Sequence, residues 1–339
     1  MIDPWITEHL TPDLSRLTAP VSLIVFIMII DGLSRLVPAI RDHLRPLLGV
    51  PFSFFNGLQQ KLARSSRSSA DLHRRGVIAV LLIIGLGIVL AYICERLGMQ
   101  SRHFATIIWF TVWRWSVGWT IARDIIALPK ADARQGRAVF ARRKMPVFTN
   151  LPDQADAAAV YRVTIETLAL TLVHGLFAPL TYALIFAVFG YAPLYGAVLG
   201  VMGTALAEVR PTDATQRQFQ TLAQAIGNGI LFLPSRIAGF VLILAALFTP
   251  KANILTGVTR MIRQGHLYPV FSLGWVMAAI SGIFGIAFQT TGQDWLGGSH
   301  ATARIEKTML ARVLWLHVVT VLMVVLILCA VMLLSIYKA

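Results

Sequence analysis

Long runs of apolar residues without a charged side chain are the feature that most constrains how this chain can fold. A helix that crosses a bilayer needs about 20 such residues, because its backbone groups must be hydrogen-bonded within the segment. Four runs have this character: Val77–Cys94 with 18 residues, Thr167–Phe189 with 23, Leu267–Gln293 with 27 and Val313–Tyr337 with 25. Charged residues make up only 14% of the chain, against about 25% in soluble domains. The sequence therefore predicts an all-α integral membrane protein.

Three weaker runs also favour spanning helices. They are Thr18–Val37, which contains Asp31 and Arg35, His103–Ala122, which contains Arg114 among tryptophans, and Gly190–Ala207. The run Ile237–Pro250 has only 14 residues. If all the basic loops are to lie on one side of the membrane, either this run or Gly190–Ala207 must be re-entrant. We expect the shorter run to be the re-entrant one. A re-entrant backbone must be covered by protein or water, so we also expect a polar pocket near residues 226–240. The prediction is a polytopic bundle of about seven transmembrane helices and one re-entrant segment.

The charge distribution predicts an orientation. Residues 32–76 hold eight Lys and Arg against two acidic residues, residues 123–162 again hold eight Lys and Arg, and residues 1–19 hold one Arg and three acidic residues. Basic loops stay preferentially on the cytoplasmic side. We therefore expect one domain over residues 1–339 in a bacterial inner membrane, with basic cytoplasmic loops at 38–75 and 123–162 and a periplasmic N-terminus. The net charge of +14 then reflects these loops, and no nucleic acid partner is expected.

Polar side chains inside apolar runs are the candidates for chemistry, because a charge in lipid costs at least about 2 kcal/mol. They are Asp31, Arg114, Glu166, His174 and Arg236. The tryptophans around Arg114 favour a packing role. Glu166 and His174 are eight residues apart and share a broad helix face. They could act as an acid–base pair or bind a cation, or Glu166 could mark the membrane boundary while His174 bonds a neighbouring helix.

Spacing gives two further indications. Gly196, Gly200 and Gly203 follow one another at helical intervals, which predicts close packing of two helices. Two cysteines and eight scattered histidines give no ligand spacing, so no metal site is predicted.

The segment ETLALTLVHGLFAPLTY, Glu166–Tyr182, resembles the motif ETxxENTxDGxxAPLF of the CobD/CbiB family, membrane proteins of cobalamin biosynthesis. Further similarities follow in the same order: GYAPL at Gly190–Leu194 to GGAPL, FLPSRIAG at Phe232–Gly239 to YLPARL, GWVMAAISGIFG at Gly274–Gly285 to GWxEAAxAGALG, and DWLG at Asp294–Gly297 to WIG. The resemblance covers roughly residues 160–300. It implies an amide-bond-forming ligase, a cobinamide-phosphate synthase, that joins adenosylcobyric acid to aminopropanol phosphate with Mg and ATP.

This chain departs from the family pattern at the acidic positions. Within the motif, this chain has Leu170 in place of the second Glu, Thr171 in place of the Asn and His174 in place of the Asp. The two Asp residues that precede LPAR in the family correspond to Gly227 and Asn228 here. The Glu that follows GW corresponds to Met277. Glu208 is the one candidate substitute in a further acidic segment. Because clustered carboxylates supply magnesium ligands and a base, the departures predict impaired or lost catalysis, a pseudoenzyme.

On this resemblance we expect catalytic roles for Glu166 and His174 and binding of substrate or phosphate by Asn228 and Arg236. Mg and ATP are expected only if the synthase activity is retained. The expected partners are membrane lipids, a corrinoid or nucleotide ligand and a protein partner in the membrane. One alternative is an AmpE-like regulator or scaffold, because FLPSRIAGFV is also similar to the WVPVRLAG pattern of that branch. The other alternative is a transporter.

Overall fold

Helices build almost all of the described chain. This computed structural model describes residues 13–34, 49–64, 67–100, 108–109, 115–129, 131–142, 154–208, 213–289, 295–298 and 301–338. The long helices are α5 (Ser69–Gln100), α12 (Ala214–Ala246), α15 (Lys307–Lys338) and the pair α9 (Ala157–Leu172) and α10 (Ala178–Val188), joined by a π-helical turn (Val173–Phe177). The shorter helices are α2 (Thr18–Ser34), α4 (Gly49–Leu62), α7 (Trp115–Ala127), α8 (Ala133–Arg142), α11 (Pro193–Ala207), α13 (Ile254–Gln264) and α14 (Gly274–Phe284). Two 3-10 turns (Leu14–Leu17 and Phe271–Leu273) and the antiparallel strands β1 (Phe288–Gln289) and β2 (Trp295–Leu296) complete the elements.

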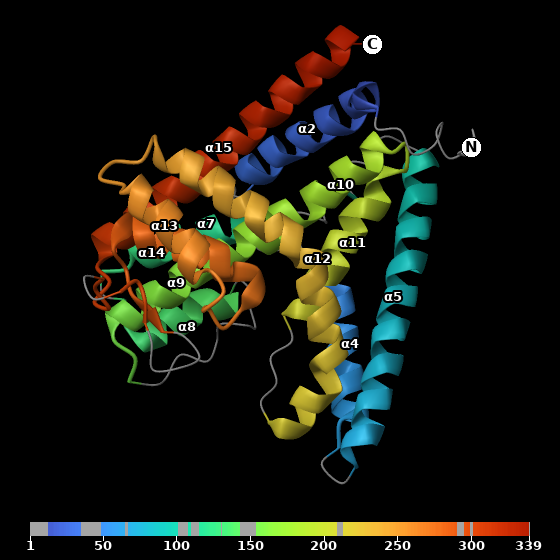
Figure 1. Cartoon of the computed structure of the whole chain (residues 1–339), viewed down its shortest axis with the longest axis horizontal. Helices are drawn as coiled ribbons and strands as arrows, with labels where there is room; N and C mark the ends of the chain where they lie inside the picture. The colour runs from blue at the N-terminus through green and yellow to red at the C-terminus, as the bar shows by residue number, and fades with distance from the viewer. Residues whose placement is uncertain are drawn as a thin grey trace.

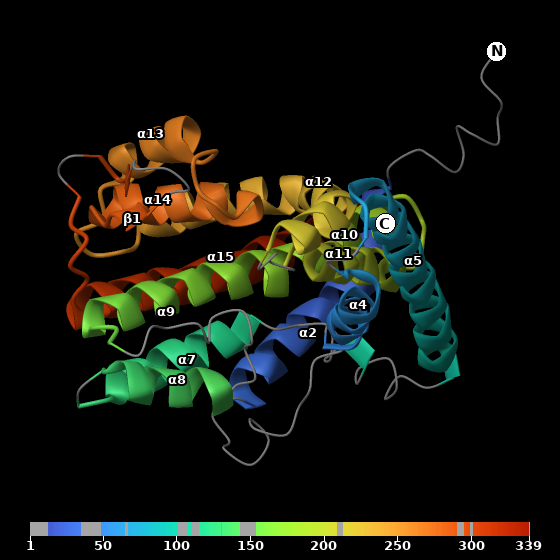
Figure 2. The same ribbon diagram turned by 90° about the horizontal axis from the view of Figure 1, so that it is seen from below.

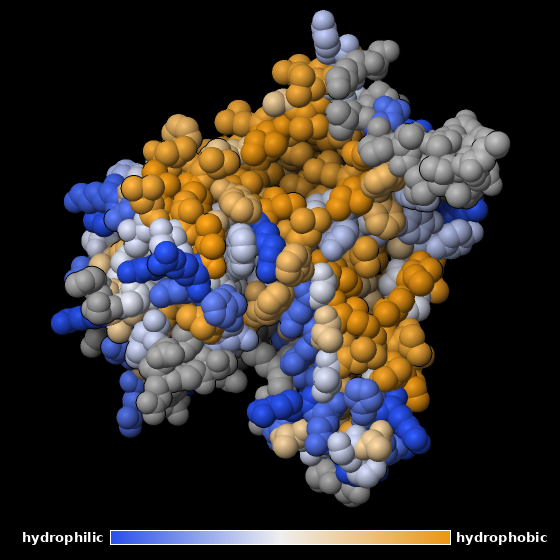
Figure 3. Space-filling view, in the orientation of Figure 1, coloured by the Kyte–Doolittle hydropathy of each residue, from blue (hydrophilic) through white to orange (hydrophobic). Residues whose placement is uncertain are grey.

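The helices lie in layers around α9 and α15. In Figure 2, α13 and α14 lie on one side of α9 and α15, and α7 and α8 lie on the other. Helices α4, α5 and the first half of α12 project together from the rest of the molecule, toward the bottom of Figure 1, and are here called the limb. Figure 3 shows apolar side chains over much of this face and polar side chains at the far end of the limb.

Four helices of the described chain are long and apolar enough to cross a membrane: α5, the continuous helix Ala157–Val188, α12 and α15. Three of them contain the predicted runs that begin at Val77, Thr167 and Val313. The all-α membrane architecture is therefore confirmed at this level. The predicted number of about seven spans is not confirmed, because α2, α7 and α11 are shorter than a span. Much of the segment His103–Ala122 lies outside the described residues.

The predicted span Leu267–Gln293 is wrong. Its helical part is only Phe271–Phe284, and Gly285 ends α14 in the left-handed conformation, with φ at 66°. Nearly all of α14 is buried within the protein. Its apolar composition therefore reflects a protein core and not lipid contact.

The prediction of a re-entrant Ile237–Pro250 is also wrong, because α12 runs without interruption from Ala214 to Ala246 and contains Pro234. Proline has no N–H, so the carbonyl four residues earlier, that of Ile230, loses its helical donor. The hydroxyl of Tyr182 on α10 donates to that carbonyl at 2.6 Å. The helix can therefore continue through the proline at membrane depth, where every backbone group needs a partner.

The two predicted basic loops contain helices. Within residues 38–75, α4 packs on α12 through the rings of Phe55 and Phe219, whose centroids are 6.0 Å apart. A buried hydrogen bond of 2.8 Å from Gln220 to Gln59 joins the same two helices. Within residues 123–162, α8 occupies Ala133–Arg142.

Glycines let α10 and α11 pack as a close hairpin. A Cβ at Gly196 or Gly200 would collide with the carbonyl groups of Tyr182 and Ala178 on α10. The prediction of close packing at these glycines is confirmed. The hairpin fixes the end of α11 beside the π-helical turn, where the candidate site lies.

Candidate functional site

A π-helical turn interrupts the long helix at the segment singled out by the sequence. Pro179 has no N–H and therefore cannot donate to the carbonyl of Gly175. In the residue before it, the N–H of Ala178 donates to the carbonyl of Val173, five residues earlier, which is the hydrogen-bond spacing of a π-helix. Such turns occur frequently at functional sites. His174 lies within this turn.

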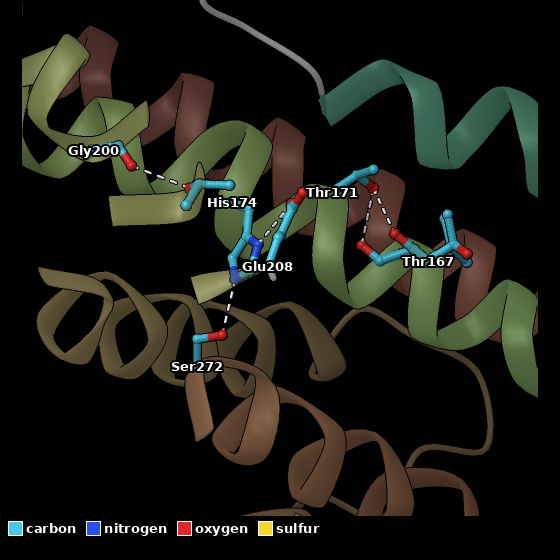
Figure 4. Close-up of polar contacts among 8 residues, drawn as sticks. Thr167, Thr171, His174, Gly200, Glu208 and Ser272 are labelled. Carbon is cyan, nitrogen blue, oxygen red and sulfur yellow. Dashed lines mark hydrogen bonds and ion pairs between the residues drawn. The ribbon is translucent and has the colours of Figure 1, made fainter. Parts of the chain in front are cut away.

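The imidazole of His174 is held at both ring nitrogens. Nδ1 lies 3.0 Å from Oε1 of Glu208, and Nε2 lies 2.9 Å from Oγ of Ser272 (Figure 4). A carboxylate only accepts, so Nδ1 donates to Glu208, and Nε2 shares a hydrogen bond with the Ser272 hydroxyl. All three side chains are buried, with exposed fractions of 2% for His174, 9% for Glu208 and 0% for Ser272.

Three separate elements supply this network, here called the His174 network and defined as His174, Glu208 and Ser272. His174 comes from the π-helical turn, Glu208 caps the C-terminus of α11, and Ser272 lies in the 3-10 turn before α14. A carboxylate, an imidazole and a hydroxyl in this order resemble the catalytic triad of serine hydrolases. The hydroxyl of Ser272, however, is wholly buried. The network joins three segments of the fold.

The expected pairing of Glu166 with His174 is not what the structure shows. Both ring nitrogens of His174 contact Glu208 and Ser272, whereas Glu166 lies about 12 Å further along the axis of α9, half-buried. His174 thus bonds residues of neighbouring elements, Glu208 and Ser272. Sequence reasoning noted Glu208 only as a substitute acid and missed Ser272, for which the nearby Gly274–Trp275 motif was the only signal.

Arg236 lies among aromatic rings on α12. Its guanidinium carbon is 3.3 Å from the centroid of Phe232, 4.9 Å from that of Trp275 and 5.5 Å from that of Phe271. Nη1 donates to the Phe232 carbonyl at 3.0 Å. Within the described residues no carboxylate forms an ion pair with Arg236. Stacking on ring faces stabilises a partly desolvated cation.

Phe271 and Ser272 connect the two parts of the site. The ring of Phe271 stacks on that of Phe232 at 6.3 Å, beside Arg236. The next residue, Ser272, bonds His174. The candidate site therefore consists of the Arg236 guanidinium, which is surrounded by aromatic rings, and the adjacent buried His174 network.

Asn228 lies on the same face of α12 as Phe232 and Arg236, at intervals of four residues, and is half-buried. The residue before it, Gly227, lies where α12 meets α11. A Cβ at Gly227 would be 2.6 Å from the backbone nitrogen of Ala207 and 2.9 Å from the carbonyl oxygen of Gly203. The two backbones are therefore in contact, and no side chain fits at this position.

The remaining candidate residues lie apart from this site or outside the part of the chain that the structure describes. Asp31 is buried on α2. Arg114 lies outside the described residues. Beside Ile226 and Ile230 the structure has a cavity lined almost entirely by apolar atoms, and the expected polar pocket near residues 226–240 stays a prediction. Among the described residues, no group of three or more His, Cys, Asp or Glu is placed to hold a metal ion.

Comparisons with known proteins identify a family for this chain. The family described as "CobD/Cbib protein" matches residues 41–309. A probable cobalamin biosynthesis protein CobD of Methanococcus maripaludis strain C7 is 22% identical over 293 residues, which are 84% of this chain and 92% of the relative. A protein of the same description from Methanococcus aeolicus is 27% identical over 154 residues, which are 45% of this chain and 47% of the relative. No solved structure matches the chain significantly.

Proposed function

The chain belongs to the CobD/CbiB family, and on that premise we propose that it serves cobalamin biosynthesis as a membrane protein that binds a phosphate-bearing substrate without catalysing the ligase reaction. The curated relatives are described as probable cobalamin biosynthesis proteins, which supports the pathway. The missing acidic positions support the loss of catalysis.

One observation carries this proposal: the backbone contact at Gly227. The resemblance places an acidic residue of the family there, and in this chain α11 occupies the space that its side chain would need. With the helices packed in this way, position 227 has no room for a carboxylate side chain, which supports the proposed loss of catalysis.

Three further positions at which this chain departs from the family do not fit magnesium either. Leu170 and Met277 are buried and apolar, with exposed fractions of 3% and 0%. His174 uses both ring nitrogens in hydrogen bonds. Magnesium prefers oxygen ligands in octahedral geometry, and these side chains do not provide them. No step of the proposed function uses the metal.

In this proposal, the guanidinium of Arg236 binds the phosphate group of the substrate. Arg236 is half-buried in a candidate span, where a charge costs at least about 2 kcal/mol, so a bound anion would offset its placement. A guanidinium matches a phosphate group well, since its planar N–H donors can bond two oxygens. Asn228 lies on the same face about 12 Å along α12 from Arg236, so its amide would contact a different part of the substrate. The His174 network would hold Phe271 in place.

The test uses purified protein with adenosylcobyric acid, aminopropanol phosphate, Mg and ATP. A family member that retains the acidic motif is the positive control. We expect no cobinamide phosphate from this chain, and product formation would refute the loss of catalysis.

Calorimetric titration with aminopropanol phosphate tests binding. We expect Arg236→Gln to weaken binding about tenfold, the effect of losing one charge-assisted hydrogen bond. Arg263→Gln, at an exposed position of α13, is the matched control and should change nothing. Equal affinities for Arg236→Gln and wild type would reject the binding role.

A further inference from the structure

The apolar cavity beside Ile226 and Ile230 lies between α5 and α11. It has a volume of about 570 Å³. The side chains that bound it include Ile84, Ile88 and Ala91 of α5, Val198 and Met202 of α11, and Ile226 of α12. Figure 1 shows α5 and α11 side by side in this part of the molecule.

The cavity is long, and its lining is almost entirely apolar. On α5 its lining residues Ile84, Gly87, Ile88 and Ala91 recur at helical intervals. On α11 the lining extends from Tyr195 to Leu206, about 17 Å at the rise of an α-helix. An elongated hydrocarbon chain matches this shape.

The cavity opens toward the lipid. Ile88 lines it and is nevertheless 64% exposed on α5, a candidate span whose outward side chains, such as Leu81, are also exposed and apolar. Gly87 lets the side chain of Met202 lie close against α5, because a Cβ there would be 2.9 Å from Cγ of Met202. The occupant must therefore enter from the hydrocarbon region.

One end of the cavity carries groups suited to a lipid headgroup. The rings of Phe186 and Tyr191 lie 5.9 Å apart at this end, and Tyr191 is exposed, as tyrosines at membrane interfaces commonly are. The preceding residue, Gly190, has φ at 79°, and a Cβ there would collide with the guanidinium of Arg16. Arg16 is partly exposed and lies 3.3 Å from Asp13.

We propose that this cavity binds one acyl chain of an anionic glycerophospholipid, with the lipid phosphate at Arg16. The apolar lining would hold the chain, and the guanidinium would exchange part of its contact with Asp13 for the phosphate. This site is separate from Arg236 and does not depend on the proposed function.

Native mass spectrometry of the purified chain in detergent tests the proposal, with phosphatidylglycerol and phosphatidylcholine as the added lipids. We expect one retained lipid per chain, with phosphatidylglycerol preferred. Ala91→Phe should lower lipid occupancy about tenfold, the effect of losing about two buried methylenes. Val89→Phe, at an exposed position of α5, is the matched control and should retain the lipid.

The headgroup contact has its own variant. Arg16→Gln should abolish the preference for phosphatidylglycerol, whereas Arg96→Gln, an exposed arginine of α5, should preserve it. Equal occupancy in Ala91→Phe and Val89→Phe, or a second protein chain retained in place of lipid, would overturn the proposal.

Because Ala91→Phe could impair folding, wild-type protein is also treated with a phospholipid that carries a photoreactive acyl chain. Crosslinks should concentrate on the residues of the cavity. Crosslinks spread evenly over the exposed faces of α5 and α15 would likewise overturn the proposal.

Discussion

The hydroxyl of Tyr182 donates a hydrogen bond of 2.6 Å to the carbonyl oxygen of Ile230, four residues before Pro234. A side chain of α10 thus replaces the N–H that proline lacks in α12. The contact explains why a proline-containing helix remains continuous at a depth where lipid offers no donor.

Tyr182→Phe should therefore lower the free energy of unfolding by about 0.5–2 kcal/mol, because it leaves a carbonyl without a partner. Thermal unfolding in detergent measures this, with the exposed Tyr191→Phe as the control. In a Pro234→Ala background the loss should shrink, since the N–H of residue 234 can then bond Ile230. An undiminished loss in that background would contradict the assignment.

Gly227→Ala should destabilise the protein by about 1–3 kcal/mol despite the higher helix propensity of alanine, because its Cβ meets the backbone of α11. Gly229→Ala lies two residues away on the same helix, with no atom within 4 Å of an added Cβ. It should stabilise by up to about 1 kcal/mol. Changes of the same sign at both positions would show that the close approach is absent.

Glu208→Ala should lower the free energy of unfolding by about 1–3 kcal/mol, since Nδ1 of buried His174 would lose its acceptor. Glu208→Gln retains an acceptor oxygen and should recover most of the loss, and exposed Glu306→Ala is the control. Combined with His174→Ala, the Glu208→Ala effect should be reduced, and simple additivity would argue against a direct contact.

The proposed orientation predicts accessibility from the two sides of the membrane. In a background without Cys94 and Cys329, Thr7→Cys should react with a membrane-impermeant maleimide in intact spheroplasts. Ser68→Cys and Gln135→Cys, at exposed positions of the two basic segments, should react only after permeabilisation. Labelling of all three in intact spheroplasts would reject the orientation.

Hydropathy predicted three helices of spanning length, both the exposed α5 and the largely buried helix Ala157–Val188 among them, and failed at the short buried helix α14. The run beginning at Val77 lies in α5, which is longer than the run because polar residues extend it at both ends. The run beginning at Leu267 has the same composition but fills the interior as α14, and hydropathy alone does not distinguish the two environments. Arg236 was read as the boundary of a short run, because no sequence pattern indicated that rings from α14 and the preceding turn would cover it.

The site was predicted only in part for a similar reason. Helical spacing relates residues on one helix, so it suggested Glu166 as the neighbour of His174. The actual partners are 34 and 98 residues away in sequence, and the packing of separate elements brings them together. The family motif located His174 and Arg236, but only the fold shows which atoms they contact.

Phe271 and Ser272 belong to a single three-residue turn, so a displacement of its backbone would move both side chains. An anion that enters beside Arg236 and shifts this turn would pull the serine oxygen away from the imidazole. The nitrogen-15 resonances of the His174 ring would then report a ligand that never touches it, which makes this histidine a built-in spectroscopic probe of occupancy at the arginine.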